Sequence, residues 1–358
     1  MKTDKITLNT NNLALYRKYR PQEFNDVIGQ DLATEMLKNA IKNNKIYHAY
    51  IFSGDRGTGK TTVARIFAKE IGCAPQDIFE LDAASNNSVD DMRLIIDATK
   101  TSTFGSKYKI YILDEAHMLS KSAFNALLKT LEEPPEHVIF ILATTDKHKI
   151  PNTILSRCQE INFISPNIKT IEKLLTKISE KENIAIEKDA KNKIGEEAKG
   201  SFRDALGILE KVINLNNNKK EITLKDLEST LGIISQDELV KILEAVGEKN
   251  IFKILESINN LKLETPELTL RAYIDLVKLF ELSLYMRFVS TEEASKIFDK
   301  EIGEKTILKT KELAERYPRI ISSNNLYRLL EMEKDLNQNS NLKKTILIVG
   351  LLRIIEEE

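Results

Sequence analysis

The chain has 358 residues, of which 42% are hydrophobic and 30% are charged, and its formal net charge is −1. This length supports two or three domains with cores of their own, and the composition is typical of a globular protein. No apolar run is long enough to span a membrane and no apolar signal region opens the chain, so we expect a cytoplasmic protein without a membrane partner. The nearly neutral charge does not exclude nucleic acid, because a basic stripe can be offset by acidic faces elsewhere.

The first half of the chain alternates between strand-like and helix-like segments. After a polar stretch at 1–12, which we expect to be a flexible tail, apolar runs predict strands at 48–52, 78–81, 109–113 and 138–143. Helical spacing predicts helices at 31–43, 62–69, 89–100 and 120–132, with Ser88 capping the third. This alternation predicts an α/β domain at 13–165, with a parallel sheet flanked by helices.

The pattern becomes helical after Pro166. We expect helices at 171–180, 187–198 and 201–213, a polar linker at 215–220, and an all-helical region from Ile234 onward. The sequence therefore predicts two further domains, a small helical domain at 166–230 and a larger helical domain at 231–358.

Residues 54–61 read Gly-Asp-Arg-Gly-Thr-Gly-Lys-Thr, a phosphate-loop pattern in its required place between a strand and a helix. Glycines let successive N–H groups point at one anion, and the helix N-terminus adds partial positive charge. Lys60 is expected to reach the β- and γ-phosphates and Thr61 to offer its hydroxyl to Mg²⁺. We expect the nucleotide to contact Gly54, Gly57, Thr58, Gly59, Lys60, Thr61 and Thr62.

Two later strands end in residues that could complete a nucleotide site. Asp114 fits the role of holding Mg²⁺, and Glu115 could orient or deprotonate the attacking water. Two solvated acids at a strand end are the alternative, but the upstream phosphate loop favours function. Thr145 could hydrogen-bond the γ-phosphate or the water. The spacing of Arg157 and Arg203 alone assigns neither of them a role.

Together these motifs resemble the gamma/tau subunits of the bacterial DNA polymerase III clamp loader. The resemblance is dense from about Tyr16 to Leu206 and diffuse in the C-terminal part. Its most specific stretches are Leu-Lys-Thr-Leu-Glu-Glu-Pro-Pro at 128–135 and Ser-Arg-Cys at 156–158. The other matching motifs lie at 15–21, 27–30, 48–50, 82–85 and 114–119.

The resemblance implies an AAA+ ATPase that uses ATP and Mg²⁺ to open a ring-shaped sliding clamp and place it on primed DNA. Implied partners are other gamma/tau copies, the delta and delta-prime subunits, the clamp and primed DNA. The three implied domains are an AAA+ core, a helical lid and a C-terminal collar that oligomerises.

The resemblance also implies roles for residues that spacing leaves open. Arg157 matches an arginine finger that reaches the ATP of the neighbouring subunit, Arg203 matches the lid arginine called sensor 2, and Thr145 matches sensor 1. The segment that encloses the adenine base is matched by Tyr16, Arg17, Val27 and Ile28.

This chain departs from the family pattern in three places. The chain has only Cys73 and Cys158, in no Cys-x-x-Cys pair, so we expect no zinc where the family usually has a four-cysteine module. Asn86, Asn87 and Ser88 stand where basic residues are common, so we expect a weaker charge contribution to DNA binding. We expect DNA phosphates to be contacted by helix N-terminal amides and by Asn86, Ser88 and Lys129. The chain ends at Glu358, so we expect the short form without the tau tail.

Three other functions compete with an ATP-driven clamp-loader subunit. A non-hydrolysing scaffold like delta-prime would have a degraded phosphate loop, whereas Lys60, Thr61 and Asp114 are intact here. Another AAA+ DNA motor, such as a branch-migration helicase or a replication-restart ATPase, would lack the combination of stretches at 131–135 and 156–158. A plain DNA-binding module would leave the nucleotide motifs unexplained.

Overall fold

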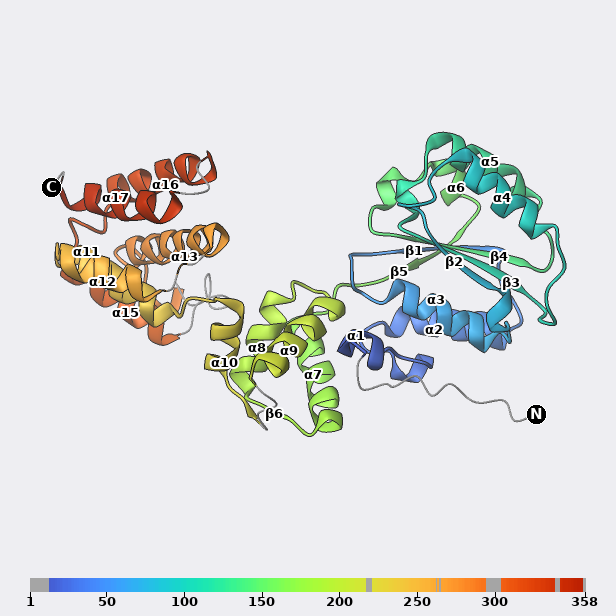
Figure 1. Ribbon diagram of the computed structural model, residues 1–358, viewed down its shortest axis with the longest axis horizontal. Helices are drawn as coiled ribbons and strands as arrows, with labels where there is room; N and C mark the ends of the chain where they lie inside the picture. The colour runs from blue at the N-terminus through green and yellow to red at the C-terminus, as the bar shows by residue number, and fades with distance from the viewer. Residues whose placement is uncertain are drawn as a thin grey trace. The chain divides into compact units, whose positions relative to one another are not determined.

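The computed structural model describes residues 13–216, 221–261, 263, 265–293, 304–338 and 342–356. These residues form two compact units, one ending at Leu227 and the other beginning at Glu228. Figure 1 shows the elements of each unit. The expected tail at 1–12 and most of the expected linker at 215–220 lie outside the described residues. The division into three domains at 165/166 and 230/231 stays a prediction.

The first unit contains a five-stranded parallel sheet in the order β2-β3-β4-β1-β5. This confirms the predicted fold class. The strands are β1 (Ala49–Ser53), β2 (Ile78–Asp82), β3 (Lys109–Asp114), β4 (Val138–Thr144) and β5 (Gln159–Asn162). The sequence did not predict β5, whose four residues Gln-Glu-Ile-Asn include one apolar side chain. Because β5 lies at the sheet edge beside β1, it needs less apolar surface than the central strands.

Helices cover both faces of this sheet (Figure 1). On one face lie α2 (Asp31–Lys42) and α3 (Lys60–Glu70), which share a core with Tyr50 and Phe52 of β1. On the other lie α4 (Val89–Thr99), α5 (Lys121–Glu132) and the short α6 (Asn152–Leu155), in a core that includes Ile51. Side chains of alternate strand residues therefore pack into the cores on the two faces of the sheet, which explains the continuous apolar runs in the sequence.

The first unit also contains three helices that we call the lid helices: α7 (Ile168–Glu182), α8 (Lys188–Glu197) and α9 (Phe202–Leu215). The four-residue α1 (Leu15–Lys18) packs against α9. The all-helical expectation missed β6 (Ala185–Ile186) and β7 (Glu221–Ile222), which pair in parallel. Two-residue strands are too short to show a period of two in the sequence. A further helix, α10, spans Leu224–Leu231.

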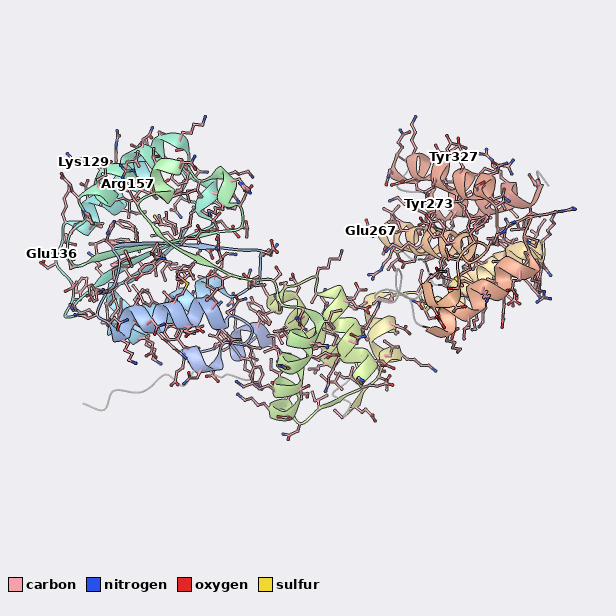
Figure 2. All side chains as sticks on the ribbon, turned by 180° about the vertical axis from the view of Figure 1, so that it is seen from behind. Lys129, Glu136, Arg157, Glu267, Tyr273 and Tyr327 are labelled. Atoms are coloured by element: carbon pink, nitrogen blue, oxygen red, sulfur yellow. The ribbon has the colours of Figure 1, made fainter. Side chains whose placement is uncertain are left out.

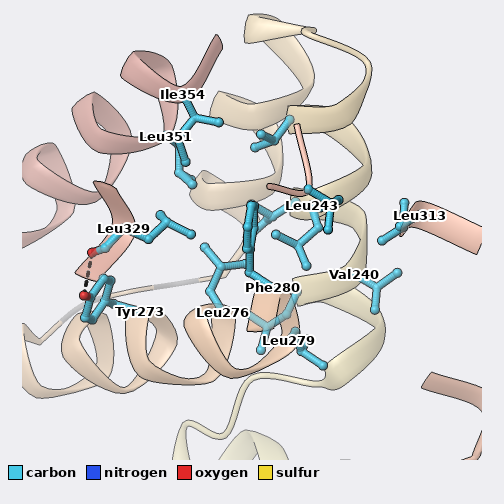
Figure 3. Close-up of a cluster of buried hydrophobic side chains, with 14 of the residues drawn as sticks. Val240, Leu243, Tyr273, Leu276, Leu279, Phe280, Leu313, Leu329, Leu351 and Ile354 are labelled. Atoms are coloured by element: carbon cyan, nitrogen blue, oxygen red, sulfur yellow. Dashed lines mark hydrogen bonds between the residues drawn. The ribbon is translucent and has the colours of Figure 1, made fainter. Parts of the chain in front are cut away.

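In the described residues of the second unit from Gln236 onward, the regular elements are helices, as predicted. The helices are α11 (Gln236–Gly247), α12 (Ile251–Asn260), α13 (Pro266–Tyr285), α15 (Glu304–Arg316), α16 (Ser323–Gln338) and α17 (Lys343–Glu356). Their apolar faces meet in one core around Leu276 and Phe280, shown in Figure 3. Among the helices of the described residues, none has both the length and the apolar character needed to cross a membrane.

Candidate nucleotide-binding site

The phosphate loop joins the end of β1 to the start of α3. Gly54 and Gly57 have φ angles of 146° and 76°, in the range that favours glycine. A Cβ on Gly57 would lie 2.0 Å from Ser201 Oγ, and a Cβ on Gly54 would lie 2.3 Å from Phe163 O. The loop backbone therefore lies directly against the segments that lead into α7 and α9, and no side chain fits at either position.

Lys60 lies inside this loop rather than in solvent. Its side chain is buried, and Nζ donates hydrogen bonds of 2.8 Å to both Gly54 O and Asp55 O. Burial lowers the pKa of the Lys60 ammonium, while Glu115 and Asp114 oppose that shift. A buried cation surrounded by a curled loop suits a phosphate group, so the residues present fit the predicted ligand.

The loop is also tied to the chain that leaves β5. Gln30, which is buried, donates from Nε2 to Thr58 O at 3.3 Å and to Ile164 O at 2.7 Å, and its Oε1 accepts from Ile164 N at 3.1 Å. At the start of α9, Phe202 N donates to Gly57 O at 3.0 Å. Gln30 belongs to the matching motif at 27–30, but no role was predicted for it, because a glutamine before a helix carries no signal for such a position.

Thr61 and Asp114 lie far apart in sequence and meet in the fold. Thr61 Oγ1 donates to Asp114 Oδ2 at 2.8 Å, which joins the first turn of α3 to the end of β3. A hydroxyl and a carboxylate are the hard oxygen ligands that Mg²⁺ prefers. The pair therefore fits the metal that the sequence predicted here.

Glu115 follows directly after β3 in a left-handed conformation, with φ of 49°. Thr145 Oγ1 donates to its Oε2 at 3.0 Å, so the two predicted polar groups lie together. His117 Nδ1 lies 3.4 Å from the same carboxylate oxygen and 3.2 Å from Thr144 Oγ1. His117 lies in the matching motif at 114–119, but no role was predicted for it, although its place two residues after Glu115 was a usable signal.

A cavity of about 510 Å³ adjoins the phosphate loop. Of the residues predicted to enclose the base, it is lined by Tyr16, Val27 and Ile28, but not by Arg17. Instead, Arg17 Nε donates to Tyr16 Oη at 3.1 Å. The loop and α3 contribute Gly57, Thr58, Gly59 and Thr62, and the lid helices contribute an apolar side that the sequence did not predict: Leu174, Ile178, Phe202 and Leu206.

Arg203 of α9 borders this cavity and also a polar hollow next to it. The hollow is lined by Asp114, Glu115 and Arg203, together with Arg56, Arg65, Glu80 and Asp82. Arg203 thus lies between the part of the site that contains the acids and the part that is largely apolar. Arg56, Arg65 and Glu80 were not predicted, since charged residues at these spacings are usually solvated.

Arg157 lies outside both hollows. It follows α6, and its guanidinium donates to Thr153 O at 2.6 Å and to Glu132 Oε1 of α5 at 2.5 Å. Figure 2 shows Arg157 and Lys129 in the same region of the α/β part. Within one chain, the structure therefore does not bring Arg157 to Lys60.

The predicted DNA contacts lie around the start of α4 and on α5. Asn86 Nδ2 donates to Asp82 O at 3.0 Å, and Lys129 is exposed. Ser88 forms a capping box with Asp91, in which Asp91 N donates to Ser88 Oγ at 3.1 Å. Because Asp90 and Asp91 occupy the first turn of α4, this helix start is less suited to phosphate than the sequence suggested. The three contacts stay predictions.

Cys73 is part of a packed interior. Its Sγ lies 3.1 Å from Tyr108 O, and burial raises the pKa of its thiol to about 11. Burial likewise raises the pKa of the Cys158 thiol to about 12. Within the described ranges, no group of three or more His, Cys, Asp or Glu side chains is placed to hold a metal. The expectation of a zinc-free protein stays a prediction.

Models of two known protein families match most of the first unit. The sequence model described as DNA polymerase III, delta subunit, matches residues 29–87 and 76–167. The one described as DNA polymerase III clamp loader subunit, ATPase lid domain, matches residues 170–218. The second match covers most of the lid helices.

Curated relatives carry related names. The chain is 44% identical to DNA polymerase III subunit tau of Bacillus subtilis, over 69% of this chain and 47% of that protein. It is 40% identical to DNA polymerase III subunit gamma of Buchnera aphidicola subsp. Baizongia pistaciae, over 66% of this chain and 69% of that protein. The chain thus spans about half of the tau relative and about two thirds of the gamma relative.

A solved structure shares the fold. The Holliday junction branch migration motor RuvB of Thermotoga maritima superposes with a TM-score of 0.51 at 21% identity, over 64% of this chain and 79% of that chain. At this identity the similarity concerns the fold alone. It agrees with a parallel sheet flanked by helices and followed by a helical region.

Proposed function

This chain belongs to the gamma/tau family of DNA polymerase III subunits, and from that premise we propose that it binds and hydrolyses ATP to load a sliding clamp onto primed DNA. The observation that carries the proposal is the 2.8 Å hydrogen bond between Thr61 and Asp114, which unites the two halves of a nucleotide site. Membership in this AAA+ family supports an ATPase acting within a DNA polymerase III complex.

The nucleotide would be held by the phosphate loop and by Lys60. Lys60 would exchange its bonds to Gly54 O and Asp55 O for phosphate oxygens, and Thr61 and Asp114 would hold Mg²⁺. When bound, the metal would neutralise charge on the phosphates. Glu115, whose carboxylate accepts from Thr145, would orient the attacking water and take its proton.

The cavity beside the loop would take the adenosine part. Tyr16, Val27 and Ile28 offer the apolar and aromatic surface that a base needs, and the lid helices contribute further apolar lining. Arg203 borders both the cavity and the acidic hollow, which supports a role in linking the phosphate state to the position of the lid helices.

Arg157 would act on the nucleotide of a neighbouring subunit. Its partly exposed guanidinium, held by Glu132 and Thr153, lies outside its own chain's cavity, which supports a role in trans. Hydrolysis would then require assembly with other copies of this chain and with delta and delta-prime subunits. The clamp and primed DNA would be further partners.

A non-hydrolysing scaffold is the second candidate. The packed Lys60, the Thr61–Asp114 pair and the Thr145–Glu115 pair argue against it, because a scaffold has no need to keep all three. Phosphate release should be measured for the chain alone and for its mixture with delta, delta-prime, clamp and primed DNA. We expect weak hydrolysis alone and stimulation in the complete mixture. Binding of MgATP without stimulated hydrolysis would favour the scaffold.

Substitution of Arg157 tests the role in trans. Arg157→Ala should lower stimulated hydrolysis by about a thousandfold, because an arginine finger stabilises transition-state charge. MgATP binding to the isolated chain should not change. Arg157→Lys keeps the charge without the planar fork and should recover only part of the activity. Stimulation of Arg157→Ala equal to that of the wild type would contradict the assignment.

A further inference from the structure

One side of the nucleotide cavity is formed by a short stretch of chain with little structure of its own. We call residues 15–22 the N-terminal wall. It consists of the four-residue α1 and the turn after it, and it contributes Tyr16, Lys18, Tyr19 and its last three residues to the cavity lining. A single helical turn is not stable by itself, because nucleation of a helix is unfavourable. The wall therefore depends on its contacts with neighbouring helices, namely α9, against which α1 packs, and α7.

The wall is fastened to α7 through one carboxylate. Glu182 Oε1 accepts hydrogen bonds from Lys18 Nζ at 2.6 Å and from Tyr19 Oη at 2.7 Å. The ammonium of Lys181 lies 5.7 Å from the centre of the Tyr19 ring, over its face. Lys18, Tyr19 and Lys181 all line the cavity, so the fastening lies at its edge.

The surroundings of Glu182 keep its carboxylate charged and held. Its side chain is 22% exposed, and that of Lys18 is 31% exposed. Burial acts to raise the pKa of Glu182, but the hydrogen bonds from Lys18 and Tyr19 outweigh it and lower the pKa. Charged hydrogen bonds in a partly covered setting are stronger than exposed ion pairs.

A second link joins α7 to the chain that follows the N-terminal wall. Lys177 Nζ donates to Asp26 Oδ1 at 3.0 Å, and both residues line the cavity. This pair is more exposed than the Glu182 cluster and has a single contact, so it adds less.

We propose that Glu182 is a positioning residue that fastens the N-terminal wall to the lid helices and thereby sets affinity for the nucleoside part of the nucleotide. The inference rests on the proposed function, in which the cavity takes the adenosine part. Movement of α7 would then carry one wall of the cavity with it. The phosphate loop is held by other bonds, from Gln30 to the chain after β5 and from Phe202 of α9 to Gly57 O, so phosphate binding should not need Glu182.

Two ligands separate the nucleoside part from the phosphates. The affinities of the full chain for MgADP and for magnesium tripolyphosphate should be measured by calorimetry. Glu182→Ala should weaken MgADP by about tenfold, the effect of losing two charge-assisted hydrogen bonds that are partly screened by solvent. Tripolyphosphate affinity should stay within about twofold. The MgADP affinity of Glu182→Gln, whose amide oxygen still accepts from Tyr19, should lie between those of the wild type and Glu182→Ala.

A matched control and a double mutant make the result specific. Glu180→Ala removes an exposed glutamate from the same helix and should leave both affinities unchanged. In a chain that already carries Lys18→Met and Tyr19→Phe, Glu182→Ala should cost no further MgADP affinity. If the single substitution unfolds the chain, the Lys18→Met and Tyr19→Phe protein reports on the same contact.

The outcomes distinguish this inference from the function on which it rests. If the wild-type chain does not bind MgADP, the proposed function fails. If the wild type binds MgADP and Glu182→Ala binds it equally well, the inference is wrong. Equal losses for MgADP and tripolyphosphate would also overturn it, because they would show general damage to the site.

Discussion

The two units differ in how they use buried polar side chains. Among its described residues, the first unit buries three charged groups, Lys60, Asp77 and Lys109, each with bonding partners. Asp77 Oδ1 accepts from Phe104 N at 2.8 Å, and Lys109 Nζ donates to Ala98 O at 2.9 Å. In the described part of the second unit, the buried polar side chains are neutral: Thr269, Ser283, Thr306, Thr310 and Asn325.

The presence of buried charges in the first unit distinguishes polar groups that hold a ligand or loop from groups that only pack. Burying a charge costs free energy unless it is paired, so buried charges mark places where a ligand or a loop must be held. In the second unit, Ser283 Oγ donates to Leu279 O and Thr310 Oγ1 donates to Ile307 O, each within its own helix. These two bonds satisfy hydroxyls without joining other elements, whereas Thr306 Oγ1 donates to Gln236 Oε1 at 2.8 Å and joins α15 to α11. Apolar packing therefore dominates the second unit, whereas buried charges with placed partners occur in the first.

The largest effect we expect comes from removing a ring from the second core. Phe280 is fully buried beside Leu276 and Leu243, as Figure 3 shows. Phe280→Ala should lower the free energy of unfolding of that unit by about 3–5 kcal/mol, through lost burial and a cavity. Hydrogen exchange of peptides from α11 to α17 should rise, while MgADP affinity should not change.

An exposed ring of the same kind provides the control for Phe280. Phe252 lies on α12 and is largely exposed, so Phe252→Ala should change stability by less than about 0.5 kcal/mol. If Phe280→Ala also weakened MgADP binding, the separation between packing and function would be broken.

The next largest effect is expected in the first unit, where a substitution should change ligand affinity and leave stability nearly unchanged. Lys60→Ala should weaken MgADP by about a hundredfold, because it removes the cation that would contact the phosphates. Stability without nucleotide should change little, since the lost bonds go to two loop carbonyls that can be hydrated. Lys69→Ala, at an exposed position of the same helix, should leave affinity unchanged. Unchanged MgADP affinity in Lys60→Ala would contradict a phosphate role for the loop.

The same difference explains how far sequence reasoning reached. Four strands and the phosphate loop could be predicted because buried strands and glycine-rich turns leave local patterns. The edge strand β5 could not be predicted because it needs few apolar residues, and the pair β6–β7 could not because two-residue strands are too short to show a period. The cavity was half predicted: the side with Tyr16 and Val27 came from the family resemblance. The side with Leu174 and Phe202 depends on how α7 and α9 pack, which spacing does not reveal.

The matching motifs are also distributed according to this difference between polar and apolar interiors. The resemblance is dense up to Leu206, where polar residues must meet at set distances. It is diffuse in the second unit, where many apolar sequences at helical spacing can fill one core. Glu182 is an instructive exception. It lies in a region of dense resemblance but outside the matching motifs. A glutamate at the end of a helix carries no sequence signal of its contact with Tyr19.

The smallest effect we expect concerns a polar bond that crosses the core of the second unit. Tyr273 Oη donates to Leu329 O at 2.7 Å across the core, linking α13 to α16 (Figure 3). Tyr273→Phe should lower the free energy of unfolding by about 1 kcal/mol at pH 8, because the carbonyl loses its partner. Chemical denaturation followed by circular dichroism measures this change. The exposed Tyr327, on α16, provides a control, and Tyr327→Phe should have little effect at that pH.

Alkaline pH sharpens this last test. Burial raises the pKa of Tyr273 to about 12 from an ordinary value of 10.0, so the folded state favours the neutral phenol. The stability that comes from this shift is fully present below pH 10 and is lost as pH rises towards 12. The wild type should therefore lose stability faster than Tyr273→Phe above pH 10, and the difference between them should shrink. Tyr50 and Tyr111, whose pKa values burial also raises to about 12, are present in both proteins and cancel. A stability difference between the two proteins that stayed constant from pH 8 to pH 11 would show that the phenol is not held in an apolar core. The second unit would then use buried polar groups more as the first unit does.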